Sequence, residues 1–565
     1  MKRKIRILAI IAFCLFTAAG KIENKPYTIM IYMNGSDLES EFGAATDDLA
    51  EMLDSGLDSK NANVLILTGG AKRWMNDAIP EYEVVLWELE DGWLNEVKSM
   101  GKVNMGNPKT LQNFISYSMN NYPANKYGLI MWDHGGGSIA GFGHDEKFDD
   151  DSLSLLDMQY AFENAGLREN KLEFLGFDAC LMATIEMAVL ASDYAHTLIA
   201  SEDLEPGDGW DYIFLNALNE NPDICGVQLG VIIVDTFMDF YGLDSDEILS
   251  LSVVDLANVS PVMDAMGDLM SRASGILLRP QLLPASSSFR SLAIRRAQTK
   301  TFGEGSPRDN YSDMVDIGDM AIRLMDLFPR EAETVLDALK NCVLYNRHNS
   351  DVDIWGLSTF YIYGGKSLGK PSLQTYSDLE MDAEFTAYLH RFFNRLKQSG
   401  NTPQASHTDL ALWQPVSART HRMAGLLQTT CCEGEYLWPK INGHFASFYP
   451  ITKTASSRFY AIPAEANGRQ ADIIVVFNDK YPEGKIRGLR NYAGGVIQKG
   501  YDPIVKGDEI SIYSLHKDVI TGEENWHKHE PFTVSTKLYL SWEHAPHDFY
   551  VCLRHKDICC NVRYD

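Results

Sequence analysis

Short apolar runs that stop abruptly at polar or glycine residues dominate the N-terminal half of this chain. The run in GLIMWDHGGG ends at His134, and the run in LEFLGFDACLM ends at Cys180. An uninterrupted apolar run of about four to eight residues is typical of a strand that is buried on both faces of a parallel sheet. Ligands of such sheets bind outside the carboxyl ends of the strands. We therefore expect His134 and Cys180 to lie together at that edge of an α/β sheet.

Helical patterns follow most of these strand-like runs as far as about residue 250, and the alternation predicts a largely parallel sheet. The run YEVVLWELE alternates and carries charges, so we expect it at an edge of the sheet. Beyond residue 250, apolar residues recur at three- and four-residue spacing, which indicates amphipathic helices. After the polar stretch SGNTPQASHT, short strand-like runs separated by turns dominate. We therefore predict an α/β core over residues 25–250, a helix-rich extension over 251–400 and an all-β accessory domain over 405–565.

The first twenty residues have the composition of a secretory signal peptide. Basic residues precede an apolar stretch from Ile7 to Phe16, and small residues follow it. This stretch is shorter than the roughly 18 residues of a membrane span, and we find no other segment that is long and uncharged enough. Phe13 before Cys14 does not fit a lipid-attachment site. We therefore expect residues 1–20 to direct export of the protein, without a lipid anchor.

The net charge of −27 argues against a protein that binds nucleic acid, because such a protein needs a basic surface. A negative field instead favours cationic substrates or peptides. Nine cysteines would permit disulfides in an exported protein, but their spacing indicates neither a disulfide framework nor a zinc site. The pairing of the C-terminal cysteines cannot be deduced from the sequence.

Cys180 and His134 have the chemistry of a nucleophile and its base. The thiolate is the reactive form of cysteine, and Cys180 precedes LMATIEMAVLA, a predicted helix whose N-terminus would lower the pKa of the thiol. His134 would accept the thiol proton and later protonate a leaving amine. The backbone N–H groups of Gly135 and Cys180 are the natural donors to the oxyanion of a tetrahedral intermediate.

Two other interpretations of these segments stay open. A cysteine at a strand end is often a small core residue, and a peptidase-like fold without activity would then be a binding protein. The HGGG segment around His134 also occurs in lipases and esterases, where it forms an oxyanion hole. That class of enzyme needs a Gly-x-Ser-x-Gly turn around its serine, and we do not expect such a nucleophile turn in this chain.

Three segments in order, WDHGGG, GFDACLM and SEDLEPGDGW, resemble those of the clostripain family of clan CD cysteine peptidases. The resemblance covers roughly residues 25–400 and implies a caspase-like α/β/α sandwich around a mostly parallel sheet. It also implies an endopeptidase that cleaves proteins or peptides after Arg or Lys, with His134 and Cys180 as the catalytic dyad and no organic cofactor. The accessory domain has no counterpart in the shorter members, and we expect a monomer.

Charge favours the same specificity, because a buried cation needs a carboxylate partner. Asp178 lies two residues before Cys180 and therefore points to the same side of its strand. Asp208 lies in the loop EPGDGWDY, after the next predicted strand. The resemblance implies that Asp178 and Asp208 line the pocket for the Arg or Lys side chain, while a simple turn cap is the alternative for Asp208.

A long polar loop, GFGHDEKFDDDSLSLLD, separates the two catalytic candidates. Family members are often activated by self-cleavage at a basic residue in this region, so the resemblance implies Lys147 as a processing site. A solvated surface loop is the alternative. The acidic residues around Lys147 are a weak candidate for Ca²⁺, because they lack the ligand spacing and the glycine of an EF-hand. His144 is a rival for the catalytic histidine, and we prefer His134 because it ends a strand.

Overall fold

The computed structural model describes residues 24–242, 245–278, 286–303, 312–363, 369–398 and 437–561, the last range with short gaps at 447, 494–495, 498, 518–523, 539, 545–550 and 555–557. The predicted signal peptide and the vicinal Cys431 and Cys432 lie outside the described residues. In the described ranges, the helices are all too short or too polar to cross a bilayer.

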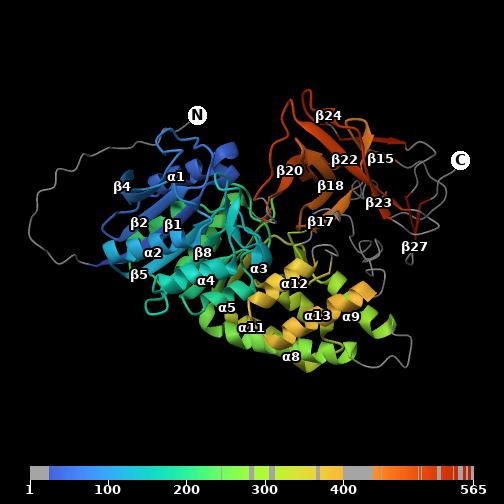
Figure 1. The fold of residues 1–565 in the computed structure, drawn as a ribbon, viewed down its shortest axis with the longest axis horizontal. Helices are drawn as coiled ribbons and strands as arrows, with labels where there is room; N and C mark the ends of the chain where they lie inside the picture. The colour runs from blue at the N-terminus through green and yellow to red at the C-terminus, as the bar shows by residue number, and fades with distance from the viewer. Residues whose placement is uncertain are drawn as a thin grey trace, which may run out of the picture.

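A nine-stranded sheet forms the centre of the N-terminal part (Figure 1). Its strands lie in the order β13 (Val343–His348), β10 (Ser250–Asp255), β9 (Ala195–Ala200), β8 (Leu172–Asp178), β5 (Ala124–Trp132), β1 (Lys25–Asn34), β2 (Ala62–Gly69), β3 (Val84–Glu90) and β4 (Trp93–Gly101). The five strands from β9 to β2 are parallel, and antiparallel strands extend the sheet on both sides. The predicted α/β class is confirmed.

The run expected at an edge of the sheet is β3, and this expectation is wrong. β3 is second from the edge because the next segment, β4, folds back and pairs with it. Five of the seven residues of β3 are buried, whereas β4 has exposed residues along its length. The charged residues that suggested an edge therefore belong to the first strand of a hairpin, and its second strand, β4, forms the edge of the sheet.

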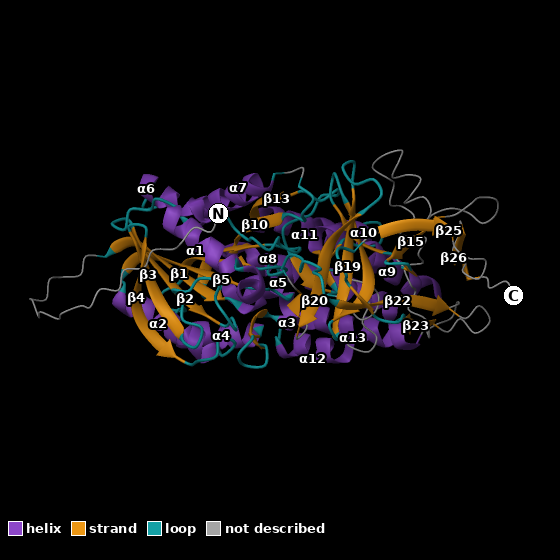
Figure 2. Ribbon diagram, turned by 90° about the horizontal axis from the view of Figure 1, so that it is seen from above, coloured by secondary structure: helices purple, strands orange, loops and turns teal. Residues whose placement is uncertain are grey.

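Helices cover both faces of the sheet, as Figure 2 shows. One face is covered by α1 (Ala44–Asp54) and α7 (Gly226–Tyr241), and the other by α2 (Pro108–Asn121), α4 (Leu155–Asn164) and α5 (Ile185–Ala191). Side chains of β1 alternate between the two cores, because successive residues of a strand point to opposite faces. Ile29 and Ile31 belong to one core, and Met30 and Tyr32 to the other.

The two helices that lead into the site strands begin at residues that cap their first turns. At the start of α2, the Asn107 side chain accepts a hydrogen bond from the Lys109 amide, and Pro108 occupies the first turn. At the start of α4, Ser154 and Asp157 form a capping box. These caps satisfy amide groups that the helix itself leaves unpaired, and they define the short connections around β5 and β8.

The helical region packs against the α5 side of the sheet and belongs to the same apolar core. Its helices are α8 (Val259–Leu277), α9 (Ser286–Gln298), α10 (Ile317–Leu324), α11 (Pro329–Cys342), α12 (Gly369–Asp378) and α13 (Ala383–Gln398). A small antiparallel sheet joins them, formed by β11 (Thr301–Phe302), β12 (Met314–Asp316) and β14 (Ser358–Phe360). Because β10 and β13 complete the central sheet, this region is continuous with the α/β part.

The C-terminal part is an antiparallel β domain with its own apolar core. Its main sheet has the order β21 (Val496–Ile497), β20 (Lys485–Ala493), β19 (Arg469–Phe477), β18 (Arg458–Ala466), β22 (Glu509–Lys517) and β23 (Glu524–Lys528), with β17 (Tyr449–Lys453) and β24 (Phe532–Thr533) paired to it. Both views place β20 on the side of this domain that faces the α/β part (Figures 1 and 2).

Candidate active site

The register of two parallel strands brings His134 and Cys180 to one edge of the sheet. Trp132, the last residue of β5, pairs with Asp178, the last residue of β8. His134 and Cys180 each follow two residues later. A Cβ atom built on Gly135 would lie 1.8 Å from the Cys180 carbonyl oxygen and 3.1 Å from its amide nitrogen, so only glycine permits this approach. The two expected oxyanion donors therefore lie side by side.

The buried Asp133 carboxylate holds the backbone that carries His134. It accepts hydrogen bonds from the amides of His134, at 2.7 Å, and His144, at 2.9 Å. Two side chains at the end of β1 donate to it as well, Asn34, the last residue of the strand, at 2.7 Å and Ser36 at 2.6 Å. Burial raises the pKa of Asp133 to about 7, and the nearby His144, the Ser36 hydroxyl and the two amides oppose the rise. The loop that carries His134 is therefore tied to two strands through one carboxyl group.

Asp37 orients the imidazole of His134 and is a functional residue that the sequence analysis missed. Its Oδ1 lies 2.7 Å from Nε2 of His134, while Nδ1 of His134 accepts the Lys499 amide at 2.7 Å. Nδ1 therefore carries no proton, and Nε2–H donates to Asp37. Although burial opposes the shift, His134 and His144 lower the pKa of Asp37. This resembles the role of the aspartate in a Ser-His-Asp triad, which fixes the tautomer of the base.

His144 lies against His134 rather than in its place. The two rings are stacked with centroids 5.1 Å apart, and Nε2 of His144 lies 3.4 Å from Asp37 Oδ1. Ligand atoms of Asp37, His134 and His144 all lie within 4.8 Å of one another, a donor set of the kind that Zn²⁺ accepts. A cation bound there would occupy Nε2 of His134, which now donates to Asp37, so cation binding would compete with the hydrogen bond between His134 and Asp37.

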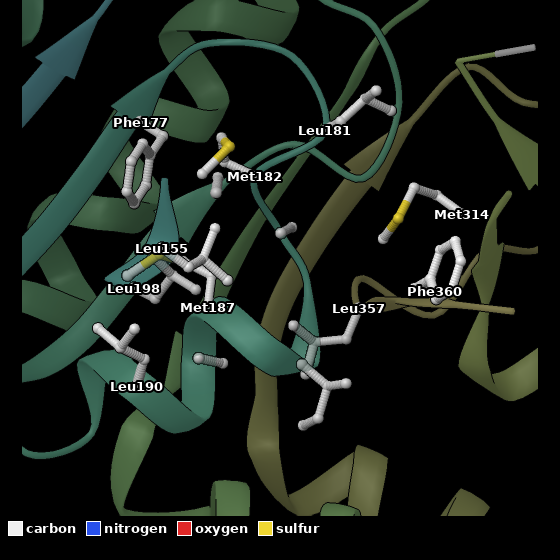
Figure 3. Packing of buried hydrophobic residues seen from close by; sticks show 14 of the residues in the cluster. Leu155, Phe177, Leu181, Met182, Met187, Leu190, Leu198, Met314, Leu357 and Phe360 are labelled. Carbon is white, nitrogen blue, oxygen red and sulfur yellow. The ribbon is translucent and has the colours of Figure 1, made fainter. Parts of the chain in front are cut away.

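Cys180 is completely buried. Burial raises the pKa of the thiol to about 12, and the Glu205 carboxylate adds to the rise. The Glu205 amide donates to Sγ at 3.2 Å. The expectation that a following helix lowers this pKa is wrong, because α5 begins only after its N-cap Thr184. Leu181 and Met182 lie between Cys180 and Thr184, and their side chains pack among apolar side chains (Figure 3). Leu181 has a φ of +62°.

An acidic pocket, which we define by Asp178, Glu205 and the ring of Trp132, lies beside Cys180. The Lys499 ammonium group donates to Asp178 Oδ1, lies 3.6 Å from Glu205 and lies 5.7 Å from the centroid of Trp132. A Cβ on Gly209, whose φ is +63°, would come within 2.6 Å of both Asp178 and the ammonium nitrogen. The pocket therefore needs a glycine in its wall and holds a cation.

Two further contacts position the Asp178 carboxylate. Its Oδ2 accepts hydrogen bonds from the Tyr212 hydroxyl, at 3.1 Å, and from the Trp210 amide, at 3.2 Å. Burial raises the pKa of Glu205 to about 8, and Lys499 opposes this rise. Glu205 is, after Asp37, the second functional residue that the sequence analysis missed, although it belongs to SEDLEPGDGW, a segment that carried the family resemblance.

The other two predicted site residues lie outside the acidic pocket. Asp208 is exposed in the turn before Gly209. Burial raises the pKa of Asp47 and of Glu51, and the charge of Asp208 adds to both shifts. Lys147 is half-buried in the turn between β6 (Phe142–Asp145) and β7 (Asp151–Leu153), and its ammonium group donates to the Glu81 carbonyl. The roles predicted for both residues stay predictions.

The acidic loop around Lys147 directs its carboxylates to protein donors. Asp145 accepts from the amides of Met105 and Lys147 at 2.8 and 2.9 Å, and Glu146 pairs with the Lys72 ammonium at 3.0 Å. These contacts tie Asp145 and Glu146 to the segments around Met105 and Lys72. Ca²⁺ binding there stays a prediction.

One sequence expectation about the esterase alternative needs correction. The pentapeptide GKSLG at residues 365–369 does match the pattern Gly-x-Ser-x-Gly. Residues 364–368 lie outside the described residues. The strand that precedes them, β14, belongs to the small sheet with β11 and β12 and not to the central sheet that carries His134. The Gly-x-Ser-x-Gly pattern therefore does not follow a strand of the central sheet, whose edge carries the HGGG segment.

Comparisons with known proteins agree with this geometry. The profile of the clostripain family, Peptidase_C11, matches residues 31–388. Clostripain from Hathewaya histolytica is 31% identical over 224 residues, which span 34% of this chain and 42% of that protein. The chain thus covers less than half the length of this curated relative. A solved structure of a secreted C11 cysteine protease from Bacteroides thetaiotaomicron, in complex with an irreversible peptide inhibitor, has a TM-score of 0.50 at 17% identity. It covers 64% of this chain and 99% of its own, and it shows the same fold.

Proposed function

Because this chain belongs to the clostripain family, we propose that it is an exported cysteine endopeptidase that hydrolyses peptide bonds after Arg or Lys. The observation that carries the proposal is the pairing of the ends of β5 and β8, which brings a thiol, an imidazole and a buried carboxylate to one edge of the sheet. The predicted signal peptide supports export, and the Bacteroides relative is itself a secreted protease. We propose a monomer that acts on protein or peptide substrates.

In the proposed mechanism, Nδ1 of His134 accepts the proton of the Cys180 thiol as Sγ attacks the carbonyl carbon of the substrate. The Asp37 carboxylate stabilises the imidazolium that forms, through the hydrogen bond to Nε2. The N–H groups of Gly135 and Cys180 donate to the oxyanion. Gly135 pairs with Phe142 in an isolated antiparallel bridge. The two hydrogen bonds of this bridge are donated by the amides of Gly136 and Gly143, so the bridge does not use the Gly135 N–H.

The second half of the reaction uses the same groups. The imidazolium of His134 gives its proton to the leaving amine, and the acyl group stays on Cys180 as a thioester. His134 then takes a proton from water, and the hydroxide attacks the thioester carbonyl. Sγ leaves as thiolate and regains the proton, so that the dyad returns to its first state. These steps use only the groups of the chain and water.

The acidic pocket supplies the specificity for a basic side chain before the cleaved bond. Asp178 and Glu205 face the ammonium group of a lysine in this structure, and a cation buried without carboxylates would be costly. We propose Asp208, at the exposed turn, as a rim carboxylate that attracts the substrate. An exposed charge contributes less than a buried one, so Asp178 and Glu205 carry most of the discrimination.

The test is a set of fluorogenic peptides that differ only in the residue before the cleaved bond, together with a lysine-based electrophile that labels thiols. Wild type, Cys180→Ala and Lys499→Met are compared, the last because it removes the cation that fills the pocket. We expect cleavage after Lys and Arg alone and a label on Cys180, identified by peptide mass. Folded protein that neither cleaves nor labels in any form would support the binding-protein alternative instead.

A further inference from the structure

We propose that the C-terminal β domain is a built-in inhibitor of this active site, and that Lys499 binds the acidic pocket as an internal ligand in an orientation that does not lead to cleavage. The inference rests on the proposed function and adds to it the regulation of the site. The clostripain profile ends at residue 388, before this domain begins. The inhibitor is therefore a feature of the part of the chain that lies beyond the family match.

Lys499 fills the pocket completely. Its side chain and those of Asp178 and Glu205 are all 0% exposed. The ammonium group also donates to the Asp178 carbonyl at 3.3 Å. Although burial opposes it, Asp178 and Glu205 raise the pKa of Lys499 above its ordinary value, so the group stays charged. A substrate lysine could not enter until this side chain leaves.

The direction of the chain at Lys499 differs from that of a substrate. If Lys499 preceded the cleaved bond, the leaving nitrogen would be that of Gly500, and His134 would have to reach it to protonate it. In the structure, His134 accepts the amide of Lys499 itself, and the Gly500 amide donates to the Glu205 carbonyl at 3.2 Å. The side chain therefore imitates a substrate while the bond that follows it turns away from the base.

The β domain holds this loop from behind. Leu489 of β20 and Asp502 exchange two backbone hydrogen bonds of 2.8 Å, and Tyr501 lies under the guanidinium group of the buried Arg490 at 5.5 Å. Arg487 of β20 forms an ion pair with Asp246 of the α/β part at 3.0 Å. The loop is thus anchored on a strand that is itself tied to the peptidase part.

Other contacts dock the domain beside the site. The Ala455 amide donates to the Asn349 carbonyl at 2.9 Å, and the Lys300 ammonium donates to Thr452 at 3.0 Å. These two hydrogen bonds and the ion pair of Arg487 surround the buried ion pair of Lys499 with Asp178. Such a tethered ligand competes at an effective concentration in the millimolar range, which is enough to exclude substrates of ordinary affinity.

The decisive experiment measures the rate at which the lysine-based electrophile labels Cys180, and compares this rate between the full-length wild type and full-length variants. Lys499→Met keeps the length of the side chain but removes its charge, and we expect labelling and hydrolysis of a lysyl peptide to rise on the order of 10²-fold. Lys506→Met, at an exposed lysine of the same domain, is the matched control and should behave as wild type. Thermal melting verifies that each variant is folded.

Arg487→Glu is the second variant, because it repels Asp246 and loosens the loop without changing the pocket. It should also label faster than wild type, and it keeps the inference testable if Lys499→Met does not fold. Equal labelling rates in wild type and both variants would overturn the inhibitor and leave the peptidase proposal intact. No labelling in any folded form would overturn both. Cleavage of wild type after Lys499, detected by mass, would overturn the non-cleavable orientation.

Discussion

The α/β part and the β domain contribute to the same site in different ways. The α/β part supplies every group of the proposed chemistry from the ends of its strands and the loops that follow them. The β domain supplies one lysine from a loop beside β20, and this lysine occupies the pocket and contacts the base. The difference teaches that a site can hold all the groups of the proposed chemistry and still be filled by a cation from a separate domain.

The largest expected effect concerns the buried carboxylate on the α/β side. Asp178→Asn in the Lys499→Met background should lower kcat/KM for lysyl peptides by roughly 10² to 10³-fold, because it leaves a buried substrate cation without its main partner. Steady-state kinetics would measure it, and Asp208→Asn is the control for a rim carboxylate, with an expected loss of about fivefold or less. A larger loss for Asp208→Asn would reverse the assignment of the pocket.

Asp37→Asn should lower kcat by about 10 to 10²-fold in the same background, with little change in KM. An asparagine can donate to Nε2 of His134 and so favour the wrong tautomer of the base. The dependence of kcat on pH should change as well. Such a change would not occur if Asp37 only supported the fold. An unchanged kcat with an altered melting temperature would show that Asp37 only supports the fold.

The closed site also predicts how Cys180 responds to pH. With a thiol pKa of about 12, alkylation of Cys180 by iodoacetamide should keep rising by about tenfold per pH unit from pH 7 to pH 10. Peptide mass mapping would follow Cys180, with the partly exposed Cys225 as an internal control. A plateau below pH 9 would contradict the raised pKa.

The same shift has a consequence for stability. The pKa of the Cys180 thiol in the folded protein lies above its ordinary value of 9.0, so folding favours the protonated thiol. Its contribution to stability is complete below pH 9 and is lost as the pH rises towards 12. The midpoint of urea unfolding of wild type should therefore fall faster over this range than that of Cys180→Ala.

The smallest effect concerns Lys147, within the α/β part. If the β domain controls access, Lys147→Ala should remove a cleavage product on a denaturing gel but change the labelling rate of the Lys499→Met variant by less than about twofold. The half-buried ammonium group donates to the Glu81 carbonyl and does not enter the acidic pocket of the described structure. If Lys147→Ala abolished labelling, processing in this loop rather than the β domain would control the enzyme.

Much of the α/β part was predictable because its signals are local. The apolar runs of β1, β5 and β8 and the caps of α2 and α4 lie within a few residues of the features they define. Asp37 was within reach of the same argument, since it belongs to a polar turn after β1 and the carboxyl ends of neighbouring strands meet. The strands β10 and β13 were not predicted, because the long helices between them hide their pairing in the central sheet.

By itself, the sequence determined that a cysteine and a histidine end two neighbouring strands, and the family motifs determined which peptidase family they belong to. Only the tertiary structure decided that Glu205 joins Asp178, that the thiol is sealed from solvent and that Lys499 fills the pocket. Lys499 lies more than 300 residues after Cys180, and a lone lysine in a loop has no local pattern. Its role follows from burial beside two carboxylates, and burial is a property of the folded chain alone.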